Sequence, residues 1–165
     1  MNEKNERSDK IFTIVITVIV ILLIAYNIFS YYGAHITLPG SEIKQITGTD
    51  PKNGEPVSID VSSGVVILNL WATWCEACVK EMPGLNAISE KHTTVGVLRG
   101  PVDDLTYERL ALSFRNAAAD DTFFDKYMIS VLPTTILLKD GTVKKVHTGM
   151  ISPDAVESWI RSIDE

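Results

Sequence analysis

The chain contains only two cysteines, Cys75 and Cys78, and two residues separate them. They follow a continuous apolar run at 65–70, which is typical of a buried strand, and a stretch with helical spacing of apolar residues comes after them. We therefore expect the pair at the start of a helix, where unpaired N–H groups and the helix dipole favour negative charge. Such a site lowers a thiol pKa from its usual value of about 8.5. This predicts Cys75 as a nucleophile and Cys78 as the thiol that resolves a mixed disulfide.

Other roles for a cysteine pair fit the composition less well. A structural disulfide framework would use more cysteines at wider spacing. A four-ligand zinc site would need two further Cys or His ligands nearby, and the three histidines, His35, His92 and His147, are scattered along the chain. We expect no metal and no cofactor. The net charge of −6, with no run rich in Lys or Arg, argues against nucleic-acid binding.

The N-terminal part predicts a membrane anchor. Residues 11–32 carry no charge and are mostly Ile, Val, Leu and Phe. As a helix rising about 1.5 Å per residue, they can cross a hydrocarbon core about 30 Å thick. The run exceeds the apolar part of a cleaved signal peptide, and no clear cleavage site follows it. Three basic residues precede the run and none follows before Lys44, which places the N-terminus in the cytoplasm.

The remaining chain predicts an α/β domain in which strands alternate with helices. We expect strands at 43–47, 57–61, 65–70, 94–98, 134–138 and 142–147, and helices at 75–91, 103–116, 121–127 and from Ser152-Pro153 onward. The first two strands form a hairpin, and the last two join through an Asp140-Gly141 turn. This order favours a mixed sheet covered by helices on both faces. The expected organisation is a cytoplasmic tail (1–10), the anchor (11–32), a linker (33–41) and an extracytoplasmic domain (42–165).

Three segments resemble the TlpA/ResA branch of thioredoxin-like proteins. These are Trp-Ala-Thr-Trp-Cys-Glu-Ala-Cys at 71–78, Lys-Glu-Met-Pro at 80–83 and Leu-Pro-Thr-Thr at 132–135. The similarity covers roughly residues 43–163 and is greatest to the ResA type, an anchored reductase of apocytochrome c. It implies a thioredoxin-like fold.

The resemblance also implies roles for residues around the cysteines. Pro133 would be the cis-proline that faces the disulfide, where backbone groups there and at Leu132 bind the substrate chain. Glu81 would match an acidic residue that tunes the thiols, and Trp74 is the tryptophan before the first cysteine. Two positions depart from relatives: Asn69 stands where thioredoxin has a buried Asp, although the ResA branch shares it, and Ala77 replaces a usual proline.

The direction of electron flow is predicted from the residue next to the nucleophile. Glu76 places negative charge beside the Cys75 sulfur, which disfavours the thiolate, and thiolate stabilisation is what makes strong oxidants oxidising. The sign favours a reductase of disulfides in exported proteins, with a membrane thiol donor restoring the dithiol. The resemblance alone implies apocytochrome c as the substrate. One alternative is a disulfide oxidase or isomerase of secreted proteins. The other is a non-catalytic thiol module that binds a metal ion or a partner chain.

Overall fold

The computed structural model describes residues 3–163, with side chains described at 10–29 and from 38 onward. The chain divides into an N-terminal unit up to Tyr32 and a second unit from Gly33. Helix α1 spans Glu3–Thr37 and therefore includes the first residues of the predicted linker. Its segment Lys10–Phe29 has a mean hydropathy of 2.8 and none of it is buried, so by length and composition it could cross a membrane.

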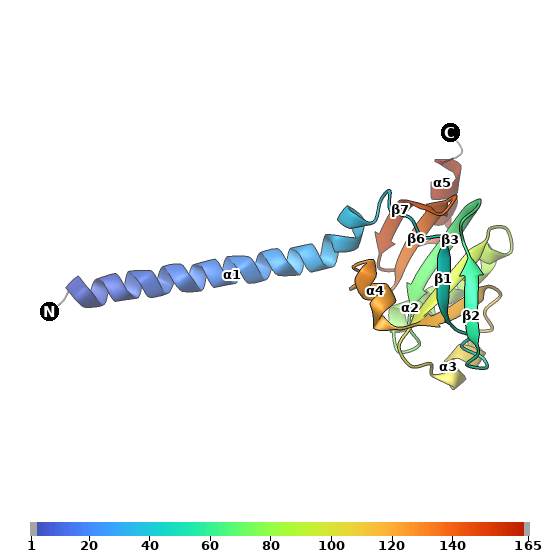
Figure 1. Cartoon of the computed structure of the whole chain (residues 1–165), viewed down its shortest axis with the longest axis horizontal. Helices are drawn as coiled ribbons and strands as arrows, with labels where there is room; N and C mark the ends of the chain where they lie inside the picture. The colour runs from blue at the N-terminus through green and yellow to red at the C-terminus, as the bar shows by residue number, and fades with distance from the viewer. Residues whose placement is uncertain (1–2, 164–165) are drawn as a thin grey trace. The chain divides into compact units, whose positions relative to one another are not determined.

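The second unit is built on a seven-stranded sheet with the order β2-β1-β5-β4-β3-β6-β7 (Figure 1). Its strands are β1 (Gln45–Thr49), β2 (Pro56–Asp60), β3 (Val65–Trp71), β4 (Thr94–Arg99), β5 (Arg115–Ala119), β6 (Thr134–Lys139) and β7 (Thr142–Thr148). Its helices are α2 (Glu76–Ser89), α3 (Asp104–Arg109), α4 (Asp121–Lys126) and α5 (Pro153–Arg161). Strands β3, β4 and β5 are parallel, and the other neighbours pair antiparallel. The predicted mixed sheet and N-terminal hairpin are confirmed.

Strand β3 contributes to apolar clusters on both faces of the sheet, because successive side chains of a strand point to opposite faces. Leu68 and Leu70 belong to the apolar cluster that also contains Phe124 of α4. Ile67 belongs to a second cluster with Ile88 of α2 and residues of α5. The odd-numbered positions of β3 therefore face α2, and the even-numbered positions face the opposite side.

The sequence signals at turns and caps agree with the structure. Asp140 and Gly141 have φ values of 50° and 72°, as a two-residue hairpin turn requires. Ser152 caps α5 by accepting from the backbone N–H of Ala155, with proline at the first helical positions.

The helix predicted at 103–116 is wrong in its second half. Helix α3 ends at Arg109, Ala111 takes a left-handed φ of 44°, and the chain then enters β5. The apolar spacing of Tyr107 and Phe114 fitted one helix, but Tyr107 packs from α3 while Phe114 lies just before the strand. Strand β5 is stabilised by its place between β4 and β1, which is a tertiary effect that overrides local propensity.

Candidate active site

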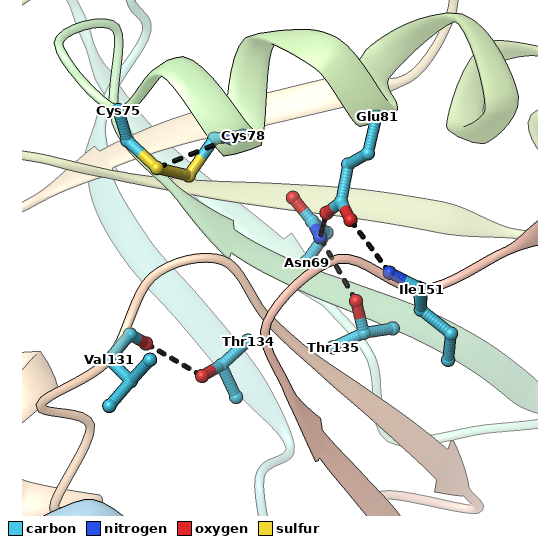
Figure 2. The surroundings of a disulfide bond; sticks show 8 residues. All are labelled: Asn69, Cys75, Cys78, Glu81, Val131, Thr134, Thr135 and Ile151. Atoms are coloured by element: carbon cyan, nitrogen blue, oxygen red, sulfur yellow. Dashed lines mark hydrogen bonds between the residues drawn. A yellow bond between two sulfur atoms is a disulfide. The ribbon is translucent and has the colours of Figure 1, made fainter.

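Cys75 and Cys78 form a disulfide at the start of α2, shortly after β3 ends, with 5.2 Å between their Cα atoms (Figure 2). Cys75 is the N-cap of α2, and the backbone N–H of Cys78 donates to the Cys75 sulfur at 3.2 Å. Cys78 is completely buried, whereas Cys75 keeps 9% of its surface exposed. The outer sulfur therefore has both solvent access and a hydrogen-bond donor, and this placement favours negative charge on it once the bond opens.

The side chain of Glu76 is exposed to solvent and forms an ion pair with Lys80. Its carboxylate pairs with Lys80 one turn later at 2.7 Å, and the hydrogen bond and charge of Lys80 lower the Glu76 pKa. The ion pair partly neutralises the charge that Glu76 places near Cys75. The electrostatic argument for a reductant is therefore weaker in the structure than in the sequence.

Glu81 lies one turn beyond Cys78 on α2 and is only 6% exposed. One carboxylate oxygen accepts from the amide nitrogen of Asn69 at 2.7 Å, and the other accepts from the backbone N–H of Ile151 at 3.0 Å. Burial raises the pKa of Glu81, although these two hydrogen bonds and the charge of His147 act in the opposite direction. Figure 2 shows the carboxylate turned toward Asn69 and Ile151 rather than toward the sulfurs.

The loop before β6 is the other wall of the site. The Leu132–Pro133 peptide bond is cis, as predicted, and Leu132 packs on the apolar cluster that contains both cysteines. The carbonyl of Pro133 accepts from the backbone N–H of Gly149 at 2.8 Å. The hydroxyl of Thr134 donates to the carbonyl of Val131 at 2.7 Å, which ties the two ends of the loop together.

Trp74 precedes the nucleophile and is 65% exposed. A Cβ built on Gly100, at the end of β4, would lie 3.7 Å from the indole nitrogen, so the ring rests near this loop without being covered by it. Trp74 therefore offers an apolar surface next to Cys75. Cys75, Cys78 and Leu132 share one cluster, whereas Glu76 and Trp74 project into solvent from the same turn.

Sequence reasoning missed the residues that hold Glu81. Asn69 stood out only as a departure from thioredoxin, and Thr135, which accepts from Asn69 at 3.1 Å, only as part of a motif. The parity of β3 could have shown that Asn69 shares a face with Ile67. The contribution of Ile151 had no signal, because it is made by a backbone N–H. Among the described side chains, at 10–29 and 38–163, the structure shows no group of three or more His, Cys, Asp or Glu residues suited to a metal ion.

The comparisons with known proteins agree with this geometry. The thioredoxin family model matches residues 51–162. The thiol-disulfide oxidoreductase ResA of Geobacillus thermodenitrificans is 30% identical over 162 residues, which cover 89% of this chain and 93% of that protein. ResA of Bacillus subtilis is 27% identical over 162 residues, covering 90% and 89%. The crystal structure of StoA from Bacillus subtilis has a TM-score of 0.57 at 21% identity, covering 73% of this chain and 98% of StoA, and supports the fold. The chain therefore belongs to the thioredoxin family, and within it to the ResA thiol-disulfide oxidoreductases.

Proposed function

We propose that the chain is a membrane-anchored reductase of disulfides in proteins outside the cytoplasm. The observation that carries the exchange activity is the asymmetry of the pair: Cys75 caps α2, keeps 9% of its surface exposed and receives the N–H of Cys78, while Cys78 is fully buried. The more accessible sulfur is suited to attack another protein, and the buried neighbour is suited to release it. The reducing direction rests on Glu76, whose negative charge beside Cys75 disfavours the thiolate even though Lys80 partly neutralises it.

The reaction transfers two electrons from the reduced Cys75/Cys78 pair to a substrate disulfide. The Cys75 thiolate attacks one sulfur of the substrate disulfide, and the other substrate sulfur leaves as a thiolate. Cys78 then attacks the mixed disulfide at Cys75, loses its proton and releases the second substrate sulfur. The substrate ends as a dithiol and the Cys75–Cys78 bond is restored. A thiol donor of the membrane supplies the electrons for the next cycle.

The backbone of Leu132 is the best-placed group to hold the substrate chain. Pro133 has no N–H, and its carbonyl is already bonded to Gly149. Leu132 is only partly buried and packs on the cluster of the two cysteines. We infer that a substrate segment lies against Leu132 on one side and the exposed ring of Trp74 on the other.

Glu81 would act on the thiols indirectly, through its electrostatic field, and not by exchanging a proton with them directly. Both of its oxygens are occupied by Asn69 and Ile151, and its carboxylate is turned away from the sulfurs in Figure 2. A direct general base would need to lie within hydrogen-bond reach, or one water away. We therefore assign Glu81 to tuning the electrostatics of the buried Cys78 side.

The anchor and the compartment follow from the N-terminal unit. Residues 10–29 form an apolar helix long enough to span a bilayer. From the basic residues at its start and before it we infer that the N-terminus lies in the cytoplasm and the second unit outside it. The resemblance to ResA proteins makes apocytochrome c the substrate class to test first.

Trapping the substrate tests the proposal. Cys78→Ala removes the resolving thiol, so the full chain should accumulate disulfide-linked to a protein from outside the cytoplasm, and Cys75→Ala should trap nothing. A reductase also predicts a reduction potential near that of thioredoxin, about −270 mV. A potential near about −120 mV, the range of strong oxidants, would favour the oxidase instead. A folded chain that exchanges with no dithiol or disulfide would refute both.

A further inference from the structure

Asn69 carries a buried hydrogen-bond acceptor with no donor. Its side chain is completely buried, and its amide nitrogen donates to Glu81 at 2.7 Å and to Thr135 at 3.1 Å. Among the groups that the structure describes, none donates to its amide oxygen. Because nearly all buried polar atoms are paired in folded proteins, an unpaired oxygen beside a redox centre calls for an explanation.

The orientation of this amide is fixed by its partners. Both oxygens of Glu81 accept hydrogen bonds, one of them from the amide nitrogen of Asn69, so the amide turns its nitrogen toward Glu81 and its oxygen away. The other oxygen of Glu81 is held by the backbone N–H of Ile151 at 3.0 Å, which keeps the carboxylate from following a rotation of the amide. The free oxygen of Asn69 is therefore directed by three hydrogen bonds.

The oxygen is directed to the side of the buried sulfur. Asn69 is an odd-numbered residue of β3, on the face of the sheet that packs against α2. Cys78 precedes Glu81 by three residues on α2, and residues at this spacing share one face of a helix. In Figure 2, the oxygen of Asn69 lies on the side of the amide nearer the disulfide, and the nitrogen lies on the side nearer Glu81 and Thr135.

We propose that Asn69 is a positioning residue whose amide oxygen accepts a hydrogen bond from the Cys78 thiol whenever the disulfide is reduced. The inference rests on the proposed redox cycle, because disulfide sulfurs carry no hydrogen to donate. Reduction adds two electrons and two protons to the bond and gives Cys78 an S–H group. When Cys78 later attacks the mixed disulfide at Cys75, that proton leaves with the departing substrate thiolate. The oxygen is thus unpaired in one redox state and paired in the other.

A partner present only in the dithiol state stabilises that state and makes the couple more oxidising. Asn69→Leu removes the acceptor, so exchange with glutathione should shift toward the disulfide by about twofold to tenfold, a tenfold shift being about 30 mV. Thr135→Val removes only an acceptor of the Asn69 nitrogen, keeps the Asn69 oxygen and its neighbour Glu81, and should not shift the equilibrium in this direction. Equal shifts in the two variants would mean that the hydrogen bonds of the Asn69 nitrogen, and not its oxygen, set the equilibrium, and would overturn the proposal.

A vibrational measurement tests the hydrogen bond itself. In a Cys75→Ser background the full chain, in detergent micelles, has one thiol, so its Raman S–H band reports Cys78 alone. The band should lie at a lower wavenumber with Asn69 present than in the Asn69→Leu variant, or in Asn69→Ala if the leucine variant does not fold. Asn86→Ala, which removes an asparagine that bonds the loop at 110–113, should leave the band unchanged.

The two measurements separate this inference from the proposed function. An S–H band that does not depend on Asn69 overturns the inference, as it would if a bound water paired the oxygen in both states, and leaves the trapping result untouched. A chain that fails to exchange electrons refutes the reductase, yet its band still shows whether Asn69 binds the Cys78 thiol.

Discussion

A hydrogen bond between β3 and β5 should be the most sensitive polar contact in the sheet. The indole nitrogen of Trp71 donates to the side-chain oxygen of Asn116 at 3.0 Å, and the Asn116 nitrogen donates to the carbonyl of Phe114 at 3.0 Å. The bond crosses β4 above Gly96, where a Cβ would lie 1.8 Å from the Asn116 oxygen. Trp71 is fully buried and Asn116 is 6% exposed.

Asn116→Ala should therefore lower the free energy of unfolding by about 2–6 kcal/mol. The substitution leaves the indole N–H of Trp71 and the carbonyl of Phe114 without these partners, and each buried polar group left unpaired costs about 1–3 kcal/mol. That is a large part of the roughly 5–15 kcal/mol by which a domain is stable. Urea unfolding of the full chain in detergent, followed by tryptophan fluorescence, measures the loss. Asn86→Ala is the matched control, because the bonds of Asn86 to the loop at Leu110–Ser113 are largely solvent-accessible, and it should cost less than about 1 kcal/mol.

A double-mutant cycle makes this reasoning sharper. Gly96→Ala alone should be strongly destabilising, because its Cβ overlaps the side chain of Asn116. In the Asn116→Ala background the overlapping oxygen is absent, so Gly96→Ala should cost at least about 1 kcal/mol less. Additive losses, or a loss below about 1 kcal/mol for Asn116→Ala alone, would refute the view that Gly96 is small to let Trp71 reach Asn116.

Three further predictions concern other parts of the chain. Because burial raises the Glu81 pKa above its ordinary value of 4.5, folding favours the neutral carboxyl; this stability is complete below about pH 4.5 and is lost as pH rises through the raised pKa. The unfolding free energy of the unsubstituted chain minus that of Glu81→Gln should therefore fall as pH rises above about 4.5 in urea titrations, and a flat difference would contradict the burial argument. Gly48→Ala would bring a Cβ within 2.2 Å of the carbonyl oxygen of Ala118 and push β1 from β5, so thermal unfolding should show a loss of about 1–3 kcal/mol, against about 0.5 kcal/mol or less for the exposed Thr47→Ala. Ile19→Lys puts a charge in the middle of the apolar helix, which makes the free energy of membrane insertion less favourable by about 2.5–3.5 kcal/mol. Alkaline extraction should therefore release a larger fraction of this variant from membranes than of the unsubstituted chain, and unchanged retention would count against the anchor.

Much of the fold was predictable because its signals are local. The apolar run at 65–70 and the cap at Ser152 each act within a few residues, and both are confirmed. Strand β5 was not predictable in this way. Its residues, Arg-Asn-Ala-Ala-Ala at 115–119, lack the β-branched and aromatic side chains that favour strands. They extend because β4 and β1 supply backbone partners on both sides.

The candidate site also contains one part that local sequence signals predict and another that depends on tertiary contacts. Spacing and the following helix were enough to predict the Cys75–Cys78 pair, which the structure shows as a disulfide. The hydrogen bonds from Asn69 and Ile151 to Glu81 span 12 and 70 positions of sequence, so they depend on how strands and helices pack. No local pattern encodes such contacts, and their consequences for the thiols stay predictions until they are measured.

Two neighbouring positions on one face of β3 show why the disulfide is held where it is. Asn69 ties this strand to α2 through Glu81, and Trp71 ties it to β5 through Asn116. The turn that carries Cys75 begins immediately after Trp71 and ends at the start of α2, so these two hydrogen bonds hold the strand before the turn and the helix after it. A nucleophile attacks efficiently only when its sulfur is held in line with the target bond. The polar residues of a buried strand, which a hydrophobic pattern treats as exceptions, are therefore the ones that fix the geometry of the reactive turn.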